Sequence, residues 1–136
     1  MAREGRLWEW LRKGAKGTSV HLCRVENLVL PGYPDVEGCW DGVGFHLELK
    51  GGERPKDPAT PVRLPVRAEQ VVWLRQRWRA GGRAFLYARV GSGLHVRRYL
   101  IPGLLAGTVR EGVPELALAG MSVLDPCHDT LQALRL

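Results

Sequence analysis

The sequence predicts an α/β (α+β) fold in which a mixed β-sheet is flanked by helices. Two apolar runs meet at Asp41-Gly42, a dipeptide suited to the tight turn of a β-hairpin. Residues 67–80 have the periodicity of an amphipathic helix, and residues 83–90 and 94–101 are typical of two further strands joined by a glycine-containing turn. The predicted order of elements is therefore αβββαββ.

Two elements are expected ahead of the hairpin. Residues 5–14 form a short predicted helix with Leu7, Trp10 and Leu11 on its buried face. Residues 19–26 alternate in polarity, which is typical of a strand. We expect this strand to pair beside the hairpin.

The second arm of the hairpin alternates strictly in polarity. Glu48 and Lys50 point to one face of this strand, whereas Leu47 and Leu49 point to the other. Asp35 begins the first arm, and pairing across the turn brings its carboxylate close to Glu48. Two carboxylates and an ammonium group are therefore expected to share one small site.

These groups are suited to metal-assisted chemistry. Mg²⁺ (or Mn²⁺) takes oxygen ligands and retains several waters, so Asp35, Glu48 and the backbone carbonyl of Leu49 can hold it against a phosphate. Lys50 can orient or help to deprotonate a metal-bound water, or stabilise charge on the phosphate. The implied reaction is phosphodiester hydrolysis. The alternative is a solvated strand face, with Asp35 in a turn after proline.

Glu26 closes the preceding strand and is a further candidate metal ligand. A strand-end residue that makes a turn hydrogen bond is the alternative, and the sequence leaves both open.

The order of these residues resembles the PD-(D/E)XK nuclease superfamily. Pro34-Asp35 followed by Glu48-Leu49-Lys50 matches the Pro-Asp and Glu-x-Lys parts of its motif, and Gln70 follows at the start of a helix. Over about residues 6–100 the pattern is similar to small phage and bacterial nucleases related to the VRR-NUC group, and to archaeal-type Holliday junction resolvases.

The resemblance implies a restriction-endonuclease-like αβββαβ core and one nuclease domain over residues 1–136, with its core at about 6–101 and a C-terminal extension at 102–136. It also implies that Gln70 lies by the metal site as a catalytic residue that binds a phosphate, a water or Lys50; an exposed helical glutamine is the alternative. In the wider superfamily an acid on the first helix sometimes joins the active site, which makes Glu9 a candidate, although its position favours a solvated helix face.

Residues 51–66 contain four prolines and no sustained period, which predicts a loop. This loop follows Lys50 directly and carries Arg54, Lys56 and Arg63, with Arg67 just beyond it. We expect these four side chains to contact a nucleic-acid backbone. A flexible connector is the alternative.

The helix at 67–80 is expected to bury a stripe formed by Val71, Val72, Leu74 and Trp78, and to end at Gly81-Gly82. Beyond residue 102, short helices are expected at 104–106, 116–119 and 129–134. This tail can cover the sheet, form a dimer contact or supply a specificity loop, and the sequence does not choose among the three.

Charge and composition narrow the function further. The 136 residues include 20 basic and 14 acidic side chains, giving a net charge of +6 and a pI near 9.7, which favours a polyanionic partner. The three cysteines lack zinc-site spacing, as expected of reduced thiols in a cytoplasmic protein. No apolar run approaches the ~20 residues of a membrane span, so we expect no membrane partner.

The favoured hypothesis is a Mg²⁺-dependent DNA endonuclease of phage or bacterial DNA processing, selective for Holliday junctions or other branched DNA. A homodimer is expected from the resemblance, because symmetric cutting of two strands calls for two sites. A non-catalytic nucleic-acid-binding module on the same fold is the alternative, and a basic protein–protein adaptor is a third.

Overall fold

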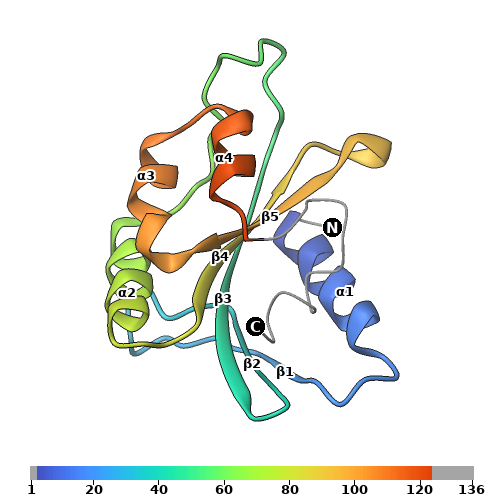
Figure 1. The fold of residues 1–136 in the computed structure, drawn as a ribbon, viewed down its shortest axis with the longest axis vertical. Coiled ribbons are helices and arrows are strands. Elements are labelled where there is room, and N and C mark those ends of the chain that lie inside the picture. Colours follow the sequence, from blue (N-terminus) through green and yellow to red (C-terminus); the bar gives the residue numbers. More distant parts are fainter. Residues whose placement is uncertain (1–2, 124–136) are drawn as a thin grey trace.

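The computed structural model describes residues 3–123 of the chain (Figure 1). The elements are α1 (Arg3–Ala15), β1 (His21–Arg24), β2 (Val36–Trp40), β3 (Val43–Gly52), α2 (Ala68–Arg79), β4 (Ala84–Val90), η1 (Gly93–His95), β5 (Arg97–Pro102), η2 (Gly103–Leu105), α3 (Ala106–Glu111) and α4 (Glu115–Met121), where η marks a 3-10 turn. The predicted αβββαββ order is confirmed.

One mixed sheet forms the middle of the molecule, with strand order β1-β2-β3-β4-β5. The pairs β1–β2, β2–β3 and β4–β5 are antiparallel, whereas β3 and β4 run parallel. The parallel pair needs a crossover connection, and α2 provides it. The mixed α+β fold class is therefore confirmed.

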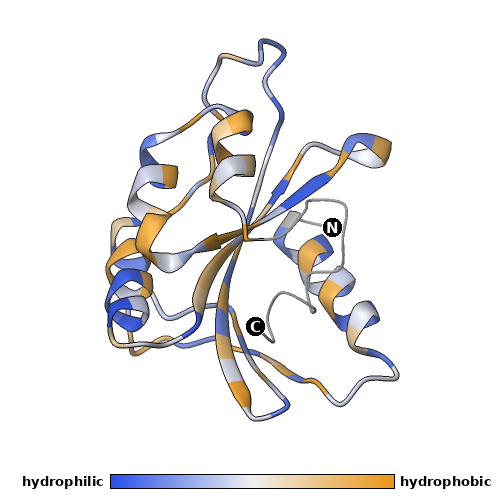
Figure 2. Ribbon diagram, viewed as in Figure 1, coloured by the Kyte–Doolittle hydropathy of each residue, from blue (hydrophilic) through white to orange (hydrophobic). Residues whose placement is uncertain are grey.

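Helices cover both faces of the sheet, with α1 on one side and α2, α3 and α4 on the other (Figure 1). The central strands are the most hydrophobic part of the ribbon, and the outward faces of the helices are largely hydrophilic (Figure 2). Leu7 and Leu11 of α1 pack against Leu47 and Leu49 of β3. Glu48 and Lys50 therefore point to the α2 face, as the alternation along this strand predicts.

The hairpin turn forms at Asp41-Gly42, where φ is +50° and +80° respectively. Positive φ at both central residues is the requirement of a type I′ turn, and glycine meets it without steric cost. The turn fixes the β2–β3 register, in which Val36 lies opposite Leu47. The predicted hairpin is confirmed.

The segment predicted as a loop at 51–66 is more ordered than expected. Strand β3 continues through Gly51 and Gly52, because both pair with β4. Further along, Val62, Leu64 and Val66 are buried in the core against α2. Their alternation with exposed residues is present in the sequence, where prolines obscure it.

Two predicted buried positions are wrong. Trp10 of α1 is 44% exposed and packs under the guanidinium of Arg98, whose Cζ lies 3.5 Å from the ring centroid. Val72 of α2 is 53% exposed, whereas Val71 and Leu74 are buried. Both apolar stripes are narrower than predicted, because each helix meets the sheet along a single seam.

The second strand predicted at 94–101 begins three residues late. Gly93–His95 is a 3-10 turn, and β5 starts at Arg97. Beyond it, α3 and α4 bury Ala106, Val109 and Leu118 against the α2 side of the sheet, so this part of the extension covers the sheet. The helix predicted at 129–134 lies outside the described residues. Within residues 3–123, no helix combines the length and apolar character that a membrane span requires.

Two substitutions on α2 can test which face of this helix is buried. Leu74→Ala should lower the free energy of unfolding by about 2–5 kcal/mol, because it opens a cavity in a fully buried site. Val72→Ala should change it by less than about 0.5 kcal/mol. Urea unfolding followed by circular dichroism gives both values, and equal losses would contradict the assigned seam.

Candidate active site

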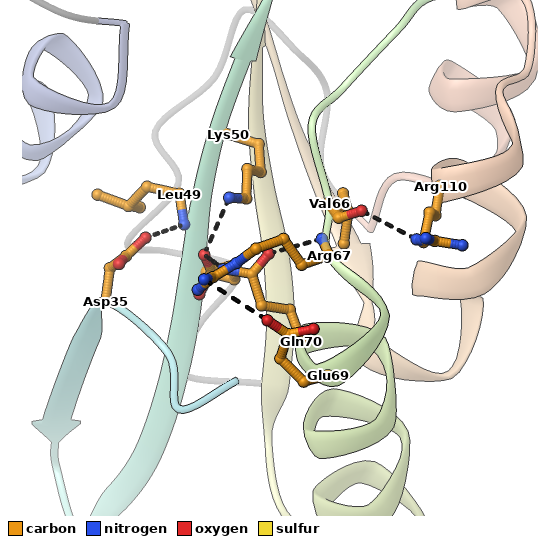
Figure 3. Close-up of polar contacts among 9 residues, drawn as sticks. Asp35, Leu49, Lys50, Val66, Arg67, Glu69, Gln70 and Arg110 are labelled. Atoms are coloured by element: carbon orange, nitrogen blue, oxygen red, sulfur yellow. Dashed lines mark hydrogen bonds and ion pairs between the residues drawn. The ribbon is translucent and has the colours of Figure 1, made fainter. Parts of the chain in front are cut away.

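The site lies beside the second half of β3, which extends past the start of β2. Strand β2 starts at Val36, opposite Leu47, so the rest of β3 has no backbone partner on that side. The carboxylate of Asp35 takes the place of the missing strand, because its Oδ2 accepts a hydrogen bond from the Leu49 backbone N–H at 3.0 Å. The bond fixes Asp35 beside β3 (Figure 3).

Glu48 is the buried centre of the site, with a side chain that is 1% exposed. Its Oε1 accepts a hydrogen bond from Gln70 Nε2 at 2.7 Å and lies 3.4 Å from Lys50 Nζ. Its Oε2 is buried and has no hydrogen-bond donor within residues 3–123. One oxygen of the carboxylate is therefore satisfied, and the other is orphaned.

Gln70 is held at both ends of its amide. It occupies the first turn of α2, where its Oε1 accepts a hydrogen bond from the Arg67 backbone N–H at 2.9 Å while its Nε2 donates to Glu48 (Figure 3). The backbone bond fixes which end of the amide faces Glu48. Gln70 is 3% exposed, so the sequence-based alternative of an exposed glutamine is wrong.

The pKa of Glu48 is raised to about 8, first by burial and then by the neighbouring charge of Asp35, while Lys50 opposes the shift. Two neighbouring carboxylates repel each other unless a proton or a cation lies between them. At neutral pH the Glu48 carboxyl therefore holds a proton in the metal-free protein.

The donor set fits a hard divalent cation. Asp35 and Glu48 supply carboxylate oxygens, and the orphaned Oε2 of Glu48 is a buried acceptor in need of a positive partner. The backbone N–H of His46 points toward β4, because it donates to the carbonyl of Arg83 just before that strand. Backbone groups alternate in direction along a strand, so the carbonyl of Leu49 points to the opposite side, where Asp35 lies.

The set does not fit a closed structural metal site. Within residues 3–123, no group of three or more His, Cys, Asp or Glu side chains is arranged to hold a metal. Mg²⁺ and Mn²⁺ tolerate this, because they commonly use one or two carboxylates and retain waters. A structural zinc site needs four protein ligands, which this group of residues does not supply.

Comparison with solved structures identifies the fold. A structure described as a VRR_NUC domain matches 68% of this chain and 87% of its own, with a TM-score of 0.50 and 19% sequence identity. The chain has the fold of a VRR_NUC domain.

A second match is Hjc of Archaeoglobus fulgidus, a Holliday junction resolvase from an archaeal hyperthermophile. It covers 86% of this chain and 95% of its own, with a TM-score of 0.47 and 14% identity. No family model and no curated protein matches the sequence.

The sequence offered two further acids, Glu9 and Glu26, as candidates for the site. Glu9 is on α1, which packs on the sheet face opposite Glu48, and its carboxylate pairs with Arg12 at 2.7 Å. The candidacy of Glu9 is therefore wrong. Glu26 is exposed and takes no part in the contacts that join Asp35, Glu48, Lys50 and Gln70.

The four predicted DNA-binding side chains divide into two groups. Arg54 is engaged internally: its guanidinium pairs with Glu115 at 2.6 Å and donates to the His95 carbonyl at 2.6 Å. A structural role for Arg54 follows, because Tyr99 donates to the same Glu115 and links the loop to β5. Sequence reasoning missed this link because Glu115 lies 61 residues away.

Lys56, Arg63 and Arg67 are exposed. Arg63 lines an open hollow of about 470 Å³ beside the end of β3, together with Gly51 and Gly52. The Arg67 side chain extends from the start of α2 toward β3 (Figure 3). Arg67 also pairs with Glu69 at 3.5 Å, and Lys56 lies in a hollow beside α4.

An aromatic cluster beside the site was not predicted. Tyr33, His46 and Trp73 meet edge-on, with ring centroids 5.1–5.9 Å apart. Burial lowers the pKa of His46, and the nearby charge of Arg77 lowers it further. The alternation of β3 places His46 on the Glu48 face, but nothing in the sequence pairs it with the other two rings.

The titration of Glu48 predicts a pH-dependent stability in the metal-free protein. Its folded pKa of about 8 lies above the ordinary 4.5, so the stabilisation is complete below about pH 4.5 and is lost as pH rises toward 8. Glu48→Gln keeps the shape without titrating. With metal removed by a chelator, the difference in free energy of unfolding between the Glu48→Gln variant and wild type should increase between about pH 4.5 and 8. The increase should be up to about 1.4 kcal/mol per pH unit in favour of the variant.

Denaturant unfolding of both proteins at pH 5, 6, 7 and 8 measures this difference. A difference that does not change with pH would show that Glu48 titrates normally, in contradiction to its buried setting.

Proposed function

We propose that this chain is a divalent-metal-dependent DNA endonuclease that hydrolyses phosphodiester bonds. The proposal rests on the proximity of the Asp35 and Glu48 carboxylates. One buried oxygen of Glu48 lacks a hydrogen-bond donor, and Lys50 Nζ lies 3.4 Å from the other oxygen. A buried carboxylate pair is costly unless a cation or a proton compensates it. The VRR_NUC fold supports the same conclusion.

Each residue has a distinct role in this proposal. Asp35, Glu48 and the Leu49 carbonyl hold Mg²⁺ or Mn²⁺, which when bound supplies positive charge against the phosphate and lowers the pKa of a coordinated water. Lys50 is the catalytic cation, because its ammonium group can donate to the attacking water or to a phosphate oxygen. Gln70 uses both amide ends within the protein, so it positions the Glu48 carboxylate.

The substrate is proposed to be DNA, and branched DNA such as a Holliday junction is its favoured form. The net charge of +6 and the exposed Lys56, Arg63 and Arg67 suit a phosphate backbone. Two matched folds, described as a VRR_NUC domain and a Holliday junction resolvase, agree with this choice. A homodimer would place two such sites on two strands.

We further propose that residues 1–136 act as one nuclease domain in phage or bacterial DNA processing, in the cytoplasm of the cell or of the phage host. Residues 102–121 belong with the core at 6–101, because α3 and α4 bury their apolar side chains against the same sheet.

Cleavage assays test this function directly. The protein is incubated with linear duplex, single-stranded and four-way-junction DNA in Mg²⁺, in Mn²⁺ and in chelator. Cutting should require the metal. Asp35→Asn and Lys50→Ala should each reduce the rate by at least about 100-fold, because each removes a group that acts at the phosphate.

Glu111→Gln is the matched control, since it removes an exposed carboxylate on α3. It should retain the wild-type rate. Metal-independent cutting, or wild-type rates in the Asp35 and Lys50 variants, would contradict the assigned roles. Tight DNA binding with no cutting in any metal would instead favour the non-catalytic binding module.

A further inference from the structure

The connection between β1 and β2 carries three consecutive apolar side chains in solvent. Leu28 is 94% exposed, Val29 is 84% exposed and Leu30 is 52% exposed. Single exposed apolar residues are ordinary, but a contiguous exposed run commonly marks an interaction site. This run, residues 28–30, is called the apolar tip.

The apolar tip is held in a fixed turn. The side-chain Oδ1 of Asn27 accepts hydrogen bonds from the backbone N–H groups of Val29 at 3.0 Å and Leu30 at 2.9 Å. The Tyr33 N–H then donates to the Leu30 carbonyl at 3.3 Å. These bonds set the direction in which the side chains project.

The same connection is pressed against α2. Gly32 has φ of +80°, and a Cβ there would lie 2.1 Å from the Glu69 carbonyl oxygen, so only glycine fits. Immediately after it, the Tyr33 ring packs against His46 and Trp73. Figure 1 shows the connection passing beside α2 before β2 begins. The apolar tip is thus anchored to the helix that carries Gln70.

Chain length keeps the apolar tip close to the proposed catalytic centre. Leu30 lies five residues before Asp35, a span of at most about 18 Å even when fully extended. That distance corresponds to about five nucleotides along one strand at 3.4 Å each. DNA held with a phosphate at Asp35 can therefore reach these side chains if it runs along this side of the molecule.

We propose that the apolar tip is a wedge that inserts against an unstacked base step next to the cut, so that the enzyme selects DNA with a branch or other discontinuity. This inference rests on the proposed nuclease function. Leucine and similar side chains act as wedges between base steps in other DNA-binding proteins. The unstacking cost is smallest where bases are already unpaired.

DNA is a better occupant than a second copy of the chain. Three side chains offer far less than the ~800 Å² per partner of a stable interface. A protein partner seated this close to Asp35 would also obstruct the substrate. The side chain of Arg67, at the start of the helix that anchors the connection, pairs with Glu69 at 3.5 Å but is 64% exposed, so it can also contact a phosphate.

The test compares Leu28→Ser/Val29→Ser/Leu30→Ser with Leu94→Ser/Leu116→Ser, which removes two exposed leucines elsewhere. Binding is measured in chelator to a four-way junction and to a linear duplex of the same sequence, with 2-aminopurine beside the branch point. Wild type and control should increase the 2-aminopurine fluorescence and prefer the junction. The triple variant should lose the fluorescence increase and about tenfold or more of the preference.

Cleavage of the same DNAs in Mg²⁺ separates the two claims. If the triple variant cuts but keeps the full junction preference and fluorescence change, the wedge is wrong and the nuclease stands. If wild type neither binds nor cuts DNA, the proposed function fails and the wedge fails with it. A triple variant that changes only the association state, seen by sedimentation, assigns the tip to a second copy and overturns the wedge.

Discussion

The close approach of two carboxylates, Asp35 and Glu48, is the constraint on which the rest of the site depends. Strand β2 begins at Val36, opposite Leu47, so it does not pair with the second half of β3, and the Asp35 side chain accepts a hydrogen bond from the Leu49 N–H there. Glu48 faces α2 from the same strand and is almost wholly buried. The sheet thus forces together two groups that repel each other when both are charged.

The residues around Glu48 compensate only part of the unfavourable energy of burying its carboxylate beside Asp35. Gln70 and Lys50 both approach Oε1, while Oε2 remains without a donor in the described part of the chain. The pKa of about 8 expresses the same imbalance, because the protein favours a proton where no cation is present. Residues whose pKa is shifted by burial and by a neighbouring charge are frequent at functional sites.

Local patterns in the sequence predicted the parts that depend on local physics. The Asp41-Gly42 turn fixed the hairpin register, and alternation placed Glu48 and Lys50 on one face. The errors at Trp10 and Val72 arose because a helix sequence shows which residues are apolar but not where the seam with the sheet falls. The ion pair of Arg54 with Glu115 was not predicted, because the two residues are distant in sequence and such pairings are decided by tertiary packing.

The most direct test of the metal site is to measure Mn²⁺ binding by titration calorimetry at pH 7, in two buffers of different ionisation enthalpy. The wild-type protein should bind Mn²⁺ and release close to one proton, because the cation displaces the proton held by Glu48. Glu48→Gln should abolish that release, and both Asp35→Asn and Glu48→Gln should weaken binding. Equal binding by all three proteins, with no proton released, would contradict the existence of the metal site.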